Sequence, residues 1–541
     1  MDGESAFEVV NRAIQTRELY IAGEKGQFWR ATKYSYENSQ TRIKMNGQLS
    51  RSFEEKLGVK QGHIKSSDDY KIYLNPLLNA IDSANLGVWV GPVNVGTSAC
   101  ADDVFVITDS QTKLQALLDI AAHYGAMYRV KYGAAKTIVT VIGAACDMQY
   151  YREIMPWSLD GLKVKVADNE HLGQIVSGTD QEQKNVESRI EKGRRNLFGM
   201  LGAAFAQKCL LSPVVKYHLY KTYTCPIIRS GLSSFSLRSE KLHALTMFHR
   251  KTLRGILSLS KNAPIPTIHF LLGDLPIEAQ IHKDIFSLFF SVWRNPNSKI
   301  YELIKYLLKN SQKNSRTWSI HIKHLATKYE IEDPLLSLNR DPPEKSQYKE
   351  LIKTKICAYH EKSLRLLAEN NSKMTYLNVS LTSLRGRHHP ALSGLIQTLD
   401  VKNSRIHLKM LGGDYLTYSI KANQSGGSPN CRCCSPLVPQ REEIEHILAV
   451  CSAYSDIRKR MIPEFLMLCQ QTQLKIDFQE ISSQMNTLTQ FILDPSSLNL
   501  KVRVNVSDPI LPIIFKLSRD YCNAIHTKRM SIIKAKEQEQ K

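Results

Sequence analysis

The sequence predicts an α+β domain at the N-terminal end, a mostly helical and basic region after it, and a small metal-binding module near the C-terminal end. Residues 1–175 mix short β-branched runs with helical stretches, which is typical of an α+β domain. From about residue 180 onward, apolar residues recur at helical spacing. Four of the 11 cysteines gather between Cys431 and Cys451, which indicates metal binding in a reducing compartment.

Length and charge narrow the class of protein. The chain has 541 residues, of which 43% are hydrophobic, so we expect two to four domains with sizeable cores. The net charge of +21 favours a polyanionic partner, either a nucleic acid or an acidic membrane surface. The start of the chain lacks the features of a signal peptide, and no apolar run approaches the roughly 20 residues of a membrane span. We therefore expect a soluble intracellular protein, cytoplasmic or nuclear or both, with no membrane partner.

Individual elements follow from local patterns. Asn46-Gly47 between strand-like arms predicts a β-hairpin. Residues 104–107 and 137–142 predict strands, with a helix between them. A second helix should start near Ser66, whose polar neighbours favour a helix cap, and Pro76 should kink or end it. Its apolar face is expected to hold Tyr70, Tyr73, Leu74, Leu77, Leu78 and Ile81.

A basic helix is expected around residues 238–254. Leu242, Leu245 and Leu253 line one face. Cationic side chains populate the others, namely Arg238, Lys241, Arg250, Lys251 and Arg254. This pattern fits two structures equally well: a solvated helix with a core stripe, or a helix beside a nucleic-acid backbone.

The pair Asp102-Asp103 stands directly before a β-branched strand. Such a pair suits a tight hairpin, in which carboxylate oxygens hold the two Mg²⁺ ions that align a 3′-hydroxyl with the α-phosphate of a nucleotide. Most Asp-Asp pairs, however, are only turns or helix caps.

Four further segments accompany the acidic pair. They are Asp2-Gly3-Glu4-Ser5-Ala6-Phe7, Gly58-Val59-Lys60-Gln61-Gly62, Tyr132-Gly133-Ala134-Ala135-Lys136-Thr137 and His171-Leu172-Gly173. In this order, the five segments resemble the successive motifs of a reverse-transcriptase palm, and the non-LTR (LINE-type) retrotransposon enzymes are most similar. The resemblance is detailed over residues 1–260 and looser beyond.

The resemblance implies RNA-directed DNA synthesis by nucleotidyl transfer, with an RNA template, a DNA primer and deoxynucleoside triphosphates as partners. Asp2 and Asp102 would ligate the two magnesium ions, with Asp103 beside them. Phe7 would exclude a ribose 2′-hydroxyl, and Gln61 and Gly62 would line the incoming nucleotide. Lys136 would stand near the pyrophosphate. Without the resemblance, Phe7 is an ordinary core residue and Lys136 a solvated lysine at a strand end.

The sequence departs from the family at several points. Cys100 replaces the larger aromatic residue usual before Ala-Asp-Asp, and Asp68 and Asp69 stand near an expected apolar pair. Because the chain begins one residue before Asp2, the fingers are expected to be missing. We therefore expect the chain to bind nucleic acid but to extend a primer poorly, and an added fingers segment to restore synthesis.

Cys431, Cys434, His446 and Cys451 form a C-x2-C-x11-H-x4-C pattern. A Cys₃His set commonly holds tetrahedral structural zinc. A helix starting near Glu443 and ending near Cys451 should present His446, and Cys433 should be spare and turned away. Buried structural cysteines are the alternative. The pattern resembles the zinc knuckle that follows the reverse transcriptase in non-LTR elements.

These patterns predict five parts: a palm without fingers (1–178), a helical thumb-like region (179–310), a helical connecting region with a linker (311–420), the zinc knuckle (421–460) and a helical C-terminal region with a frayed tail (461–541). Two other functions stay open: a non-catalytic nucleic-acid-binding remnant of a retrotransposon protein, and a zinc-dependent protein–protein adaptor.

Overall fold

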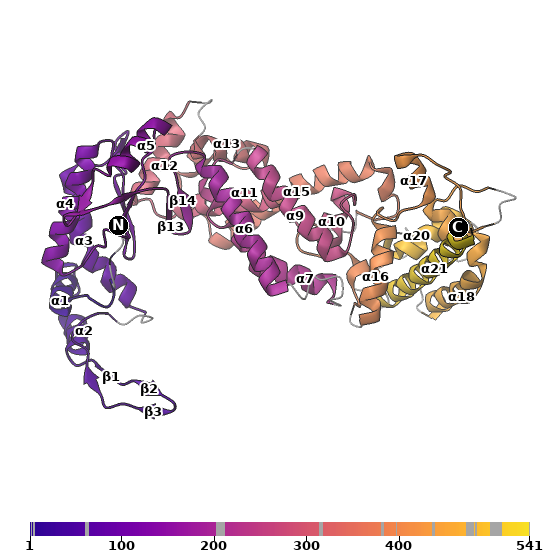
Figure 1. Ribbon diagram of the computed structural model, residues 1–541, viewed down its shortest axis with the longest axis horizontal. Helices are drawn as coiled ribbons and strands as arrows, with labels where there is room; N and C mark the ends of the chain where they lie inside the picture. Colours follow the sequence, from indigo (N-terminus) through magenta and orange to yellow (C-terminus); the bar gives the residue numbers. More distant parts are fainter. Residues whose placement is uncertain are drawn as a thin grey trace. The chain divides into compact units, whose positions relative to one another are not determined.

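The computed structural model (Figure 1) describes residues 1, 3, 6–59, 64–201, 211–237, 239–312, 317–379, 383–395, 398–434, 439–471, 481, 484–497 and 511–539. The chain divides into two compact units. Unit 1 comprises residues 1–185 and 291–315, and unit 2 comprises residues 186–290 and 316–541. The finer division into five parts stays a prediction.

Unit 1 contains both helices and strands, as the α+β pattern predicts. Its helices are α1 (Arg12–Ile21), α2 (Gly26–Glu37), α3 (Ser66–Ala84), α4 (Gln111–Tyr128), α5 (Ala145–Ile154), the start of α6 (Gln181–Leu201) and α12 (Lys299–Asn310). The antiparallel pairs are β1 (Gln40–Thr41) with β4 (Phe53–Glu54), β2 (Lys44–Met45) with β3 (Gln48–Leu49), β5 (Trp89–Val90) with β6 (Val93–Asn94), β7 (Thr97–Cys100) with β8 (Asp103–Val106), β10 (Ser158–Leu159) with β11 (Leu162–Lys163), and β13 (Asn169–His171) with β14 (Gln174–Val176). β9 (Ile138–Val139) and β12 (Lys165–Val166) pair in parallel. Within the described ranges the strands form separate two-stranded pairs, so a palm with one larger sheet stays a proposal.

The predicted hairpin at Asn46-Gly47 is present. Met45 pairs with Gln48, and both turn residues have positive φ, 51° at Asn46 and 82° at Gly47. Asn-Gly favours this turn because both residues tolerate the left-handed region.

Helix α3 carries the core of unit 1. Tyr70, Tyr73, Leu74, Leu77 and Ile81 are at most 2% exposed and lie in one cluster with residues of α4 and β8. The prediction of this apolar face is therefore confirmed, with Leu78 only partly buried.

Of the two effects expected of Pro76, an end of the helix is excluded, because α3 runs through it, and a kink stays a prediction. Burial of the α3 face offsets the backbone hydrogen bond that proline removes. The Tyr124 hydroxyl also donates to the Tyr73 carbonyl oxygen at 2.6 Å and ties this turn of α3 to α4. The helix starts at Ser66, as predicted, but its cap differs. The cap residue is Lys65, which makes no side-chain capping bond, and Asp68 and Asp69 lie in the first turn, where their charge favours the helix dipole.

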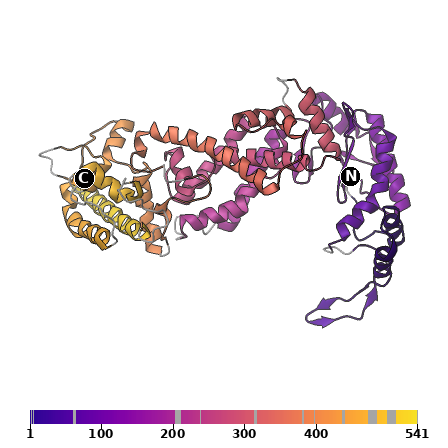
Figure 2. The ribbon, with the colours of Figure 1, turned by 180° about the vertical axis from the view of Figure 1, so that it is seen from behind.

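Unit 2 contains helices joined by loops, and its described residues form no strand, apart from one isolated β-bridge between Asn430 and Arg441 (Figures 1 and 2). Its helices are α7 (Pro213–Leu219), α8 (Cys225–Arg229), α9 (Ser239–Leu257), α10 (Ile265–Leu272), α11 (Ile277–Trp293), α13 (Trp318–Lys328), α14 (Pro334–Ser337), α15 (Lys345–Glu369), α16 (Thr398–Leu411), α17 (Tyr418–Ser425), α18 (Ser455–Gln471), α20 (Met485–Leu493) and α21 (Leu511–Glu539). None of the helices described is long and apolar enough to cross a membrane.

The basic helix expected around residues 238–254 is α9. Its apolar face is buried through Leu245 and Leu253. Arg254 is half-buried and donates to the carbonyl oxygen of Ala263 at 3.0 Å. Arg250 is half-buried too, and burial lowers its pKa. These two arginines therefore fit the reading of a helix with a core stripe, while Lys251 is exposed and Arg238 lies outside the described residues.

Two glycines with the same backbone conformation allow a matched test of the fold of unit 1. Gly58 has φ +81°, and a Cβ there would lie 2.8 Å from the carbonyl oxygen of Glu8. Gly47 has φ +82°, with nothing within 4 Å of its Cβ position. Gly47→Ala should cost about 1 kcal/mol from the left-handed backbone alone. Gly58→Ala should cost an additional ~1–3 kcal/mol from the clash. Hydrogen exchange of unit 1 peptides in increasing urea measures both, and equal losses would contradict the close approach at Gly58.

Candidate functional sites

The acidic pair lies at the tip of a tight hairpin, as predicted. Cys100 pairs with Asp103, so Ala101 and Asp102 form the two-residue turn between β7 and β8. Ala101 has φ +56°, a left-handed conformation that is costly for a residue with a Cβ. Asp102 and Asp103 are both half-buried. Because Asp102 belongs to the turn, the alternation that would point two adjacent strand residues to opposite faces does not apply to it.

The first residues of the chain run beside this hairpin. The Met1 ammonium donates to the Val104 carbonyl oxygen at 2.7 Å, and the Val104 amide donates to the Met1 carbonyl oxygen at 3.0 Å. Gly3 forms a β-bridge with Tyr132. Asp2 itself lies outside the described residues, so its position relative to Asp102 stays a prediction.

An open cavity of about 490 Å³ borders the hairpin within unit 1. Met1, Asp103, Lys136 and His171 all line it, so residues from three of the five predicted segments meet there, together with the residue that precedes the first segment. The ring of Phe105 on β8 stacks on His171, with centroids 5.1 Å apart. Lys136 is exposed and ends the turn that precedes β9. These segments are 33 or more residues apart in sequence, and this convergence is what an active site requires.

The turn at His171-Leu172-Gly173 also forms as predicted. His171 pairs with Gln174, and the two turn residues have positive φ, 49° at Leu172 and 76° at Gly173. The hairpin β13–β14 thereby brings His171 to the cavity.

The start of the segment Gly58-Val59-Lys60-Gln61-Gly62, called the glycine loop below, contacts the segment around Phe7 through backbone hydrogen bonds. Gly58 donates to the Val10 carbonyl oxygen and Val59 to that of Phe7, both at 2.8 Å. The backbone that Gly58 approaches closely is that of Phe7 and Glu8, where a Cβ at Gly58 would lie 2.8 Å from the Glu8 carbonyl oxygen. Gln61 and Gly62 lie outside the described residues.

Phe7 is half-buried and stacks on Tyr70 of α3, with centroids 4.7 Å apart and an interplanar angle of 24°. This placement suits an ordinary core residue as well as a nucleotide contact, so its role stays a prediction. Cys100, which we expected to loosen packing, is exposed at the end of β7.

Arg12 is a functional support that the sequence did not reveal. Its side chain is buried, and its Nε donates to the Gly58 carbonyl oxygen at 2.9 Å. Its guanidinium also pairs with Glu55 at 3.1 Å and donates to the Tyr36 carbonyl oxygen at 2.7 Å. Arg12 therefore ties the glycine loop to α1. Its signal in the sequence is weak, since one arginine at the start of an amphipathic helix is unremarkable.

Near the C-terminal end, the four predicted zinc ligands come together in unit 2. The ligand atoms of Cys431, Cys434, His446 and Cys451 all lie within 4.8 Å of one another. The thiols of Cys431 and Cys451 are 3.9 Å apart, and the Cys434 thiol is 3.7 Å from Nε2 of His446. Tetrahedral zinc with bonds of about 2.3 Å to sulfur and 2.0 Å to nitrogen separates its ligand atoms by roughly 3.5–3.8 Å. The donor set and its spacing fit structural zinc.

The local backbone explains how His446 and Cys451 reach one site. Residues His446–Val450 form a π-helical turn, closed by a 2.7 Å bond from the Cys451 amide to the His446 carbonyl oxygen. This five-residue step places both side chains on one side, which the 3.6-residue period of an α-helix does less well. The helix expected between Glu443 and Cys451 is therefore present, but it is mostly π-helical. It ends at Cys451, as predicted.

Cys433 is outside the four-ligand set but is not turned away, contrary to the prediction. Its thiol lies within 4.8 Å of the Cys431 thiol and a carboxylate oxygen of Glu442. Its amide donates to the Cys431 sulfur at 3.4 Å. Hydrogen bonds from the thiols of Cys433 and Cys451 hold the pKa of Cys431 far below its ordinary value. The geometry thus favours a thiolate, the form that binds zinc.

A buried ion pair connects α21 to the cysteine–histidine module, the segment that carries Cys431, Cys434, His446 and Cys451. The Arg529 guanidinium contacts both carboxylate oxygens of Glu442, at 2.6 Å and 3.3 Å. Glu442 is fully buried and also accepts from the Tyr418 amide at 2.8 Å. Arg529 lies over the rings of Tyr415 and Tyr418, 5.5 Å from each centroid. The position of the module thus depends on the last long helix of the chain.

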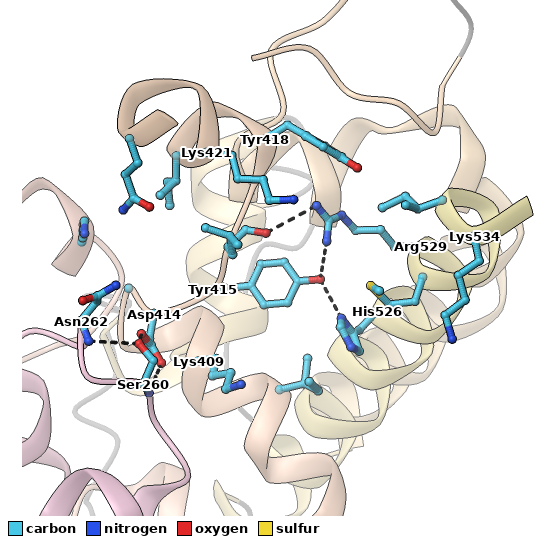
Figure 3. A pocket seen from close by; sticks show the side chains of 18 of the residues that line it. Ser260, Asn262, Lys409, Asp414, Tyr415, Tyr418, Lys421, His526, Arg529 and Lys534 are labelled. Carbon is cyan, nitrogen blue, oxygen red and sulfur yellow. Dashed lines mark hydrogen bonds between the residues drawn. The ribbon is translucent and has the colours of Figure 1, made fainter. Parts of the chain in front are cut away.

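Beside this ion pair lies a basic pocket of about 600 Å³ (Figure 3). Lys373, Lys409, Lys421 and Lys534 line it, and no ion pair within the described part of the chain neutralises these four lysines. Two acidic groups, Asp414 and Glu537, also line it, and Asp414 accepts from the Ser260 amide at 2.7 Å. On the floor, Tyr415 connects His526, at 2.9 Å, with Arg529 (Figure 3). The pocket is therefore electropositive and suits an anion.

Comparison with known proteins gives consistent similarities. Residues 1–182 match the family described as reverse transcriptase (RNA-dependent DNA polymerase). The chain is 22% identical over 283 residues to the retrovirus-related Pol polyprotein from type-1 retrotransposable element R2 of Popillia japonica, an alignment that covers 51% of this chain and 44% of the relative. It is 27% identical over 274 residues to the retrovirus-related Pol polyprotein from type-2 retrotransposable element R2DM of Drosophila melanogaster, covering 50% of this chain and 25% of the relative. The matched region is less than half the length of either relative.

The zinc assignment predicts the behaviour of three variants. Cys434→Ser and His446→Gln should each lower the zinc content of the full chain by one equivalent, because each removes a protein ligand. Residues 421–460 should then become sensitive to protease, since structural zinc contributes about 10–16 kcal/mol to the folding of such modules. Cys433→Ser is the matched control and should retain its zinc. Unchanged zinc in Cys434→Ser would exclude the four-ligand site.

Proposed function

We propose that residues 1–182 are the reverse-transcriptase domain of a non-LTR retrotransposon protein, and that the chain carries out RNA-directed DNA synthesis at the hairpin of Asp102 and Asp103. The observation that supports the proposal most is the cavity at which Met1, Asp103, Lys136 and His171 meet. The match to the family covers only the first third of the chain, so the activity, the RNA template, the DNA primer and the deoxynucleoside triphosphates are all part of the proposal.

Carboxylates on a tight hairpin fit the requirement of Mg²⁺ for hard oxygen ligands. When bound, two magnesium ions would lower the barrier to attack of a primer 3′-hydroxyl on an α-phosphate. We assign Asp2, Asp102 and Asp103 to hold them. Met1 and Gly3 are each paired to neighbouring backbone, which supports placing Asp2 beside β8. The left-handed Ala101 positions both aspartates at the turn.

The remaining assignments concern the nucleotide. Lys136 lines the cavity and is exposed, so its ammonium can reach a pyrophosphate group and stabilise the charge that develops there. Phe7, held against Tyr70, would limit space at the ribose 2′ position, with Gln61 and Gly62 lining the same nucleotide. Arg12 fixes the Gly58 carbonyl and so supports the loop that carries Gln61 and Gly62.

Replacing both carboxylates tests the polymerase site. Asp102→Asn with Asp103→Asn should reduce Mg²⁺-dependent primer extension to background and leave RNA affinity unchanged, because only the metal ligands are lost. Asp119→Asn is the matched control: this exposed aspartate accepts from the side-chain amide of Gln115 at 2.8 Å, does not line the cavity and should leave extension intact. Each variant is compared with its parent, both as the chain itself and with a fingers segment placed before Met1. Equal extension by the double variant and its parent would contradict the assignment.

A second function, nucleic-acid binding without catalysis, is favoured by the basic pocket beside the zinc module. We propose that its lysines contact the phosphates of RNA or single-stranded DNA. The zinc module positions Glu442, and Glu442 positions Arg529 at the pocket floor. If the double aspartate variant and its parent are equally inactive but bind RNA tightly, this second function is the correct one.

Charge reversal tests the pocket. Lys409→Glu with Lys421→Glu should weaken binding of single-stranded RNA and reduce the slope of log affinity against log salt by about 1.4, because each lost phosphate contact contributes roughly 0.7. The control changes total charge equally: Lys33→Glu with Lys355→Glu removes two lysines that already face carboxylates, at 3.7 Å and 3.6 Å. Identical slopes for the two double variants would contradict binding at the pocket. No RNA binding by the unchanged chain would instead favour a zinc-dependent protein adaptor.

A further inference from the structure

A buried cluster in unit 2 contains three groups that neither the polymerase site nor the zinc knuckle uses. We propose that His249, His269 and Asp274 form a second metal site, which binds zinc and stabilises the packing of α9 against α10. The ligand atoms of the three residues lie within 4.8 Å of one another, and the residues are 0%, 0% and 1% exposed.

Three elements bring these residues together. His249 lies on α9, His269 lies on α10, and Asp274 follows the left-handed Gly273 that ends α10. Nε2 of His249 is 3.0 Å from Oδ2 of Asp274. The imidazole rings of the two histidines are 6.0 Å apart between centroids. The cluster therefore consists of two imidazole nitrogens and one carboxylate oxygen, which is a common zinc donor set.

The atoms that face the shared point have few or no partners. Nε2 of His269 is buried without a hydrogen-bond partner, and Nε2 of His249 and Oδ2 of Asp274 are buried with only each other, 3.0 Å apart. Buried polar atoms without a partner are rare in folded proteins and call for an explanation. A single cation at that point satisfies all three.

The other polar atom of each ligand is already bonded, which is the arrangement that orients metal ligands. Nδ1 of His269 lies 2.9 Å from the Asp274 carbonyl oxygen. Because a carbonyl only accepts, Nδ1 carries the proton and Nε2 of the neutral ring presents a lone pair. Nδ1 of His249 lies 2.7 Å from the Tyr220 hydroxyl, and a hydroxyl oxygen can accept a hydrogen bond from Nδ1–H, which leaves the lone pair on Nε2.

Asp274 is oriented by neighbours on its Oδ1 oxygen. Tyr217 and Lys221 both donate to Oδ1 at 2.7 Å, so Oδ2 is left for one bond to a metal. The Lys221 ammonium reduces the negative charge of the carboxylate, which opposes metal binding. Lys221 is 37% exposed, however, so water screens part of that effect.

A hydrogen bond is the competing explanation, and it accounts for the geometry less completely. If Nε2 of His249 donates to Oδ2 of Asp274, the lone pair on Nε2 of neutral His269 still has no donor. A cation bonds to both nitrogens and the oxygen together. Imidazole ligands favour zinc over magnesium or calcium, and three protein ligands leave one position of a tetrahedral ion for a water molecule.

The test measures zinc in the full chain after dialysis against a weak chelator. We expect His269→Gln and Asp274→Asn each to bind one zinc equivalent fewer than the unchanged chain. Cys434→Ser should lose a different equivalent, and combining it with Asp274→Asn should lose both. His282→Gln is the matched control, because His282 is a buried histidine of unit 2 that bonds to Tyr329 at 2.7 Å, lies 4.0 Å from Glu278 and belongs to none of the possible metal-binding groups among the described residues.

Cobalt separates the two sites without a change to the cluster. Co²⁺ at the knuckle gives sulfur-to-metal charge-transfer absorption, whereas His249, His269 and Asp274 offer no sulfur. A chain with Cys434→Ser and Cys451→Ser should therefore keep d–d absorption without charge transfer, even where a cluster variant fails to fold. The proposal is overturned if that chain takes up no cobalt, or if Asp274→Asn folds and keeps the full zinc content.

Discussion

The backbone pairing between Met1 and Val104 is the constraint on which the arrangement of the candidate polymerase site depends. It joins the first residues of the chain to β8, the strand that begins with Asp103. Val104 is buried against α3 and α4. The core of unit 1 therefore fixes the position of the β7–β8 hairpin and of the first residues of the chain beside it. Gly58 and Arg12 extend this arrangement to the glycine loop, because both bond to backbone of the neighbouring segments.

The cysteine–histidine module depends on a similar connection between distant residues. Crowding of three thiols and one imidazole is unfavourable unless a cation neutralises the thiolate charge. The Glu442–Arg529 pair then links the module to α21, and a buried pair of this kind is costly to break, because removing one partner leaves a buried charge. This link explains why the basic pocket, whose floor includes Arg529, lies next to the zinc ligands.

Local patterns in the sequence predicted local structure well. Turns form at Asn46-Gly47, His171-Leu172-Gly173 and Ala101-Asp102, as the residues there or beside them predict. The spacing of the three cysteines and the histidine likewise predicted that their side chains meet at one site. Local patterns were insufficient where tertiary packing decides. Pro76 stays within α3 because the buried face of that helix outweighs one lost hydrogen bond. Gly58 closely approaches the backbone of Glu8, which is far away in sequence. The π-helical turn at His446, the Arg12 contacts and the cluster at Asp274 depend on residues far apart in sequence, so no local pattern could predict them.

Iron-directed backbone cleavage tests the central claim most directly, because Fe²⁺ replaces Mg²⁺ at oxygen sites and cuts the chain next to its ligands. With Fe²⁺, ascorbate and peroxide, the account predicts cuts near residues 1–3 and near residues 100–104, both suppressed by excess Mg²⁺. Both should also disappear in the chain with Asp102→Asn and Asp103→Asn. Cuts confined to other parts of the chain, or cuts near residues 100–104 that persist in the double variant, would contradict a metal site at this hairpin.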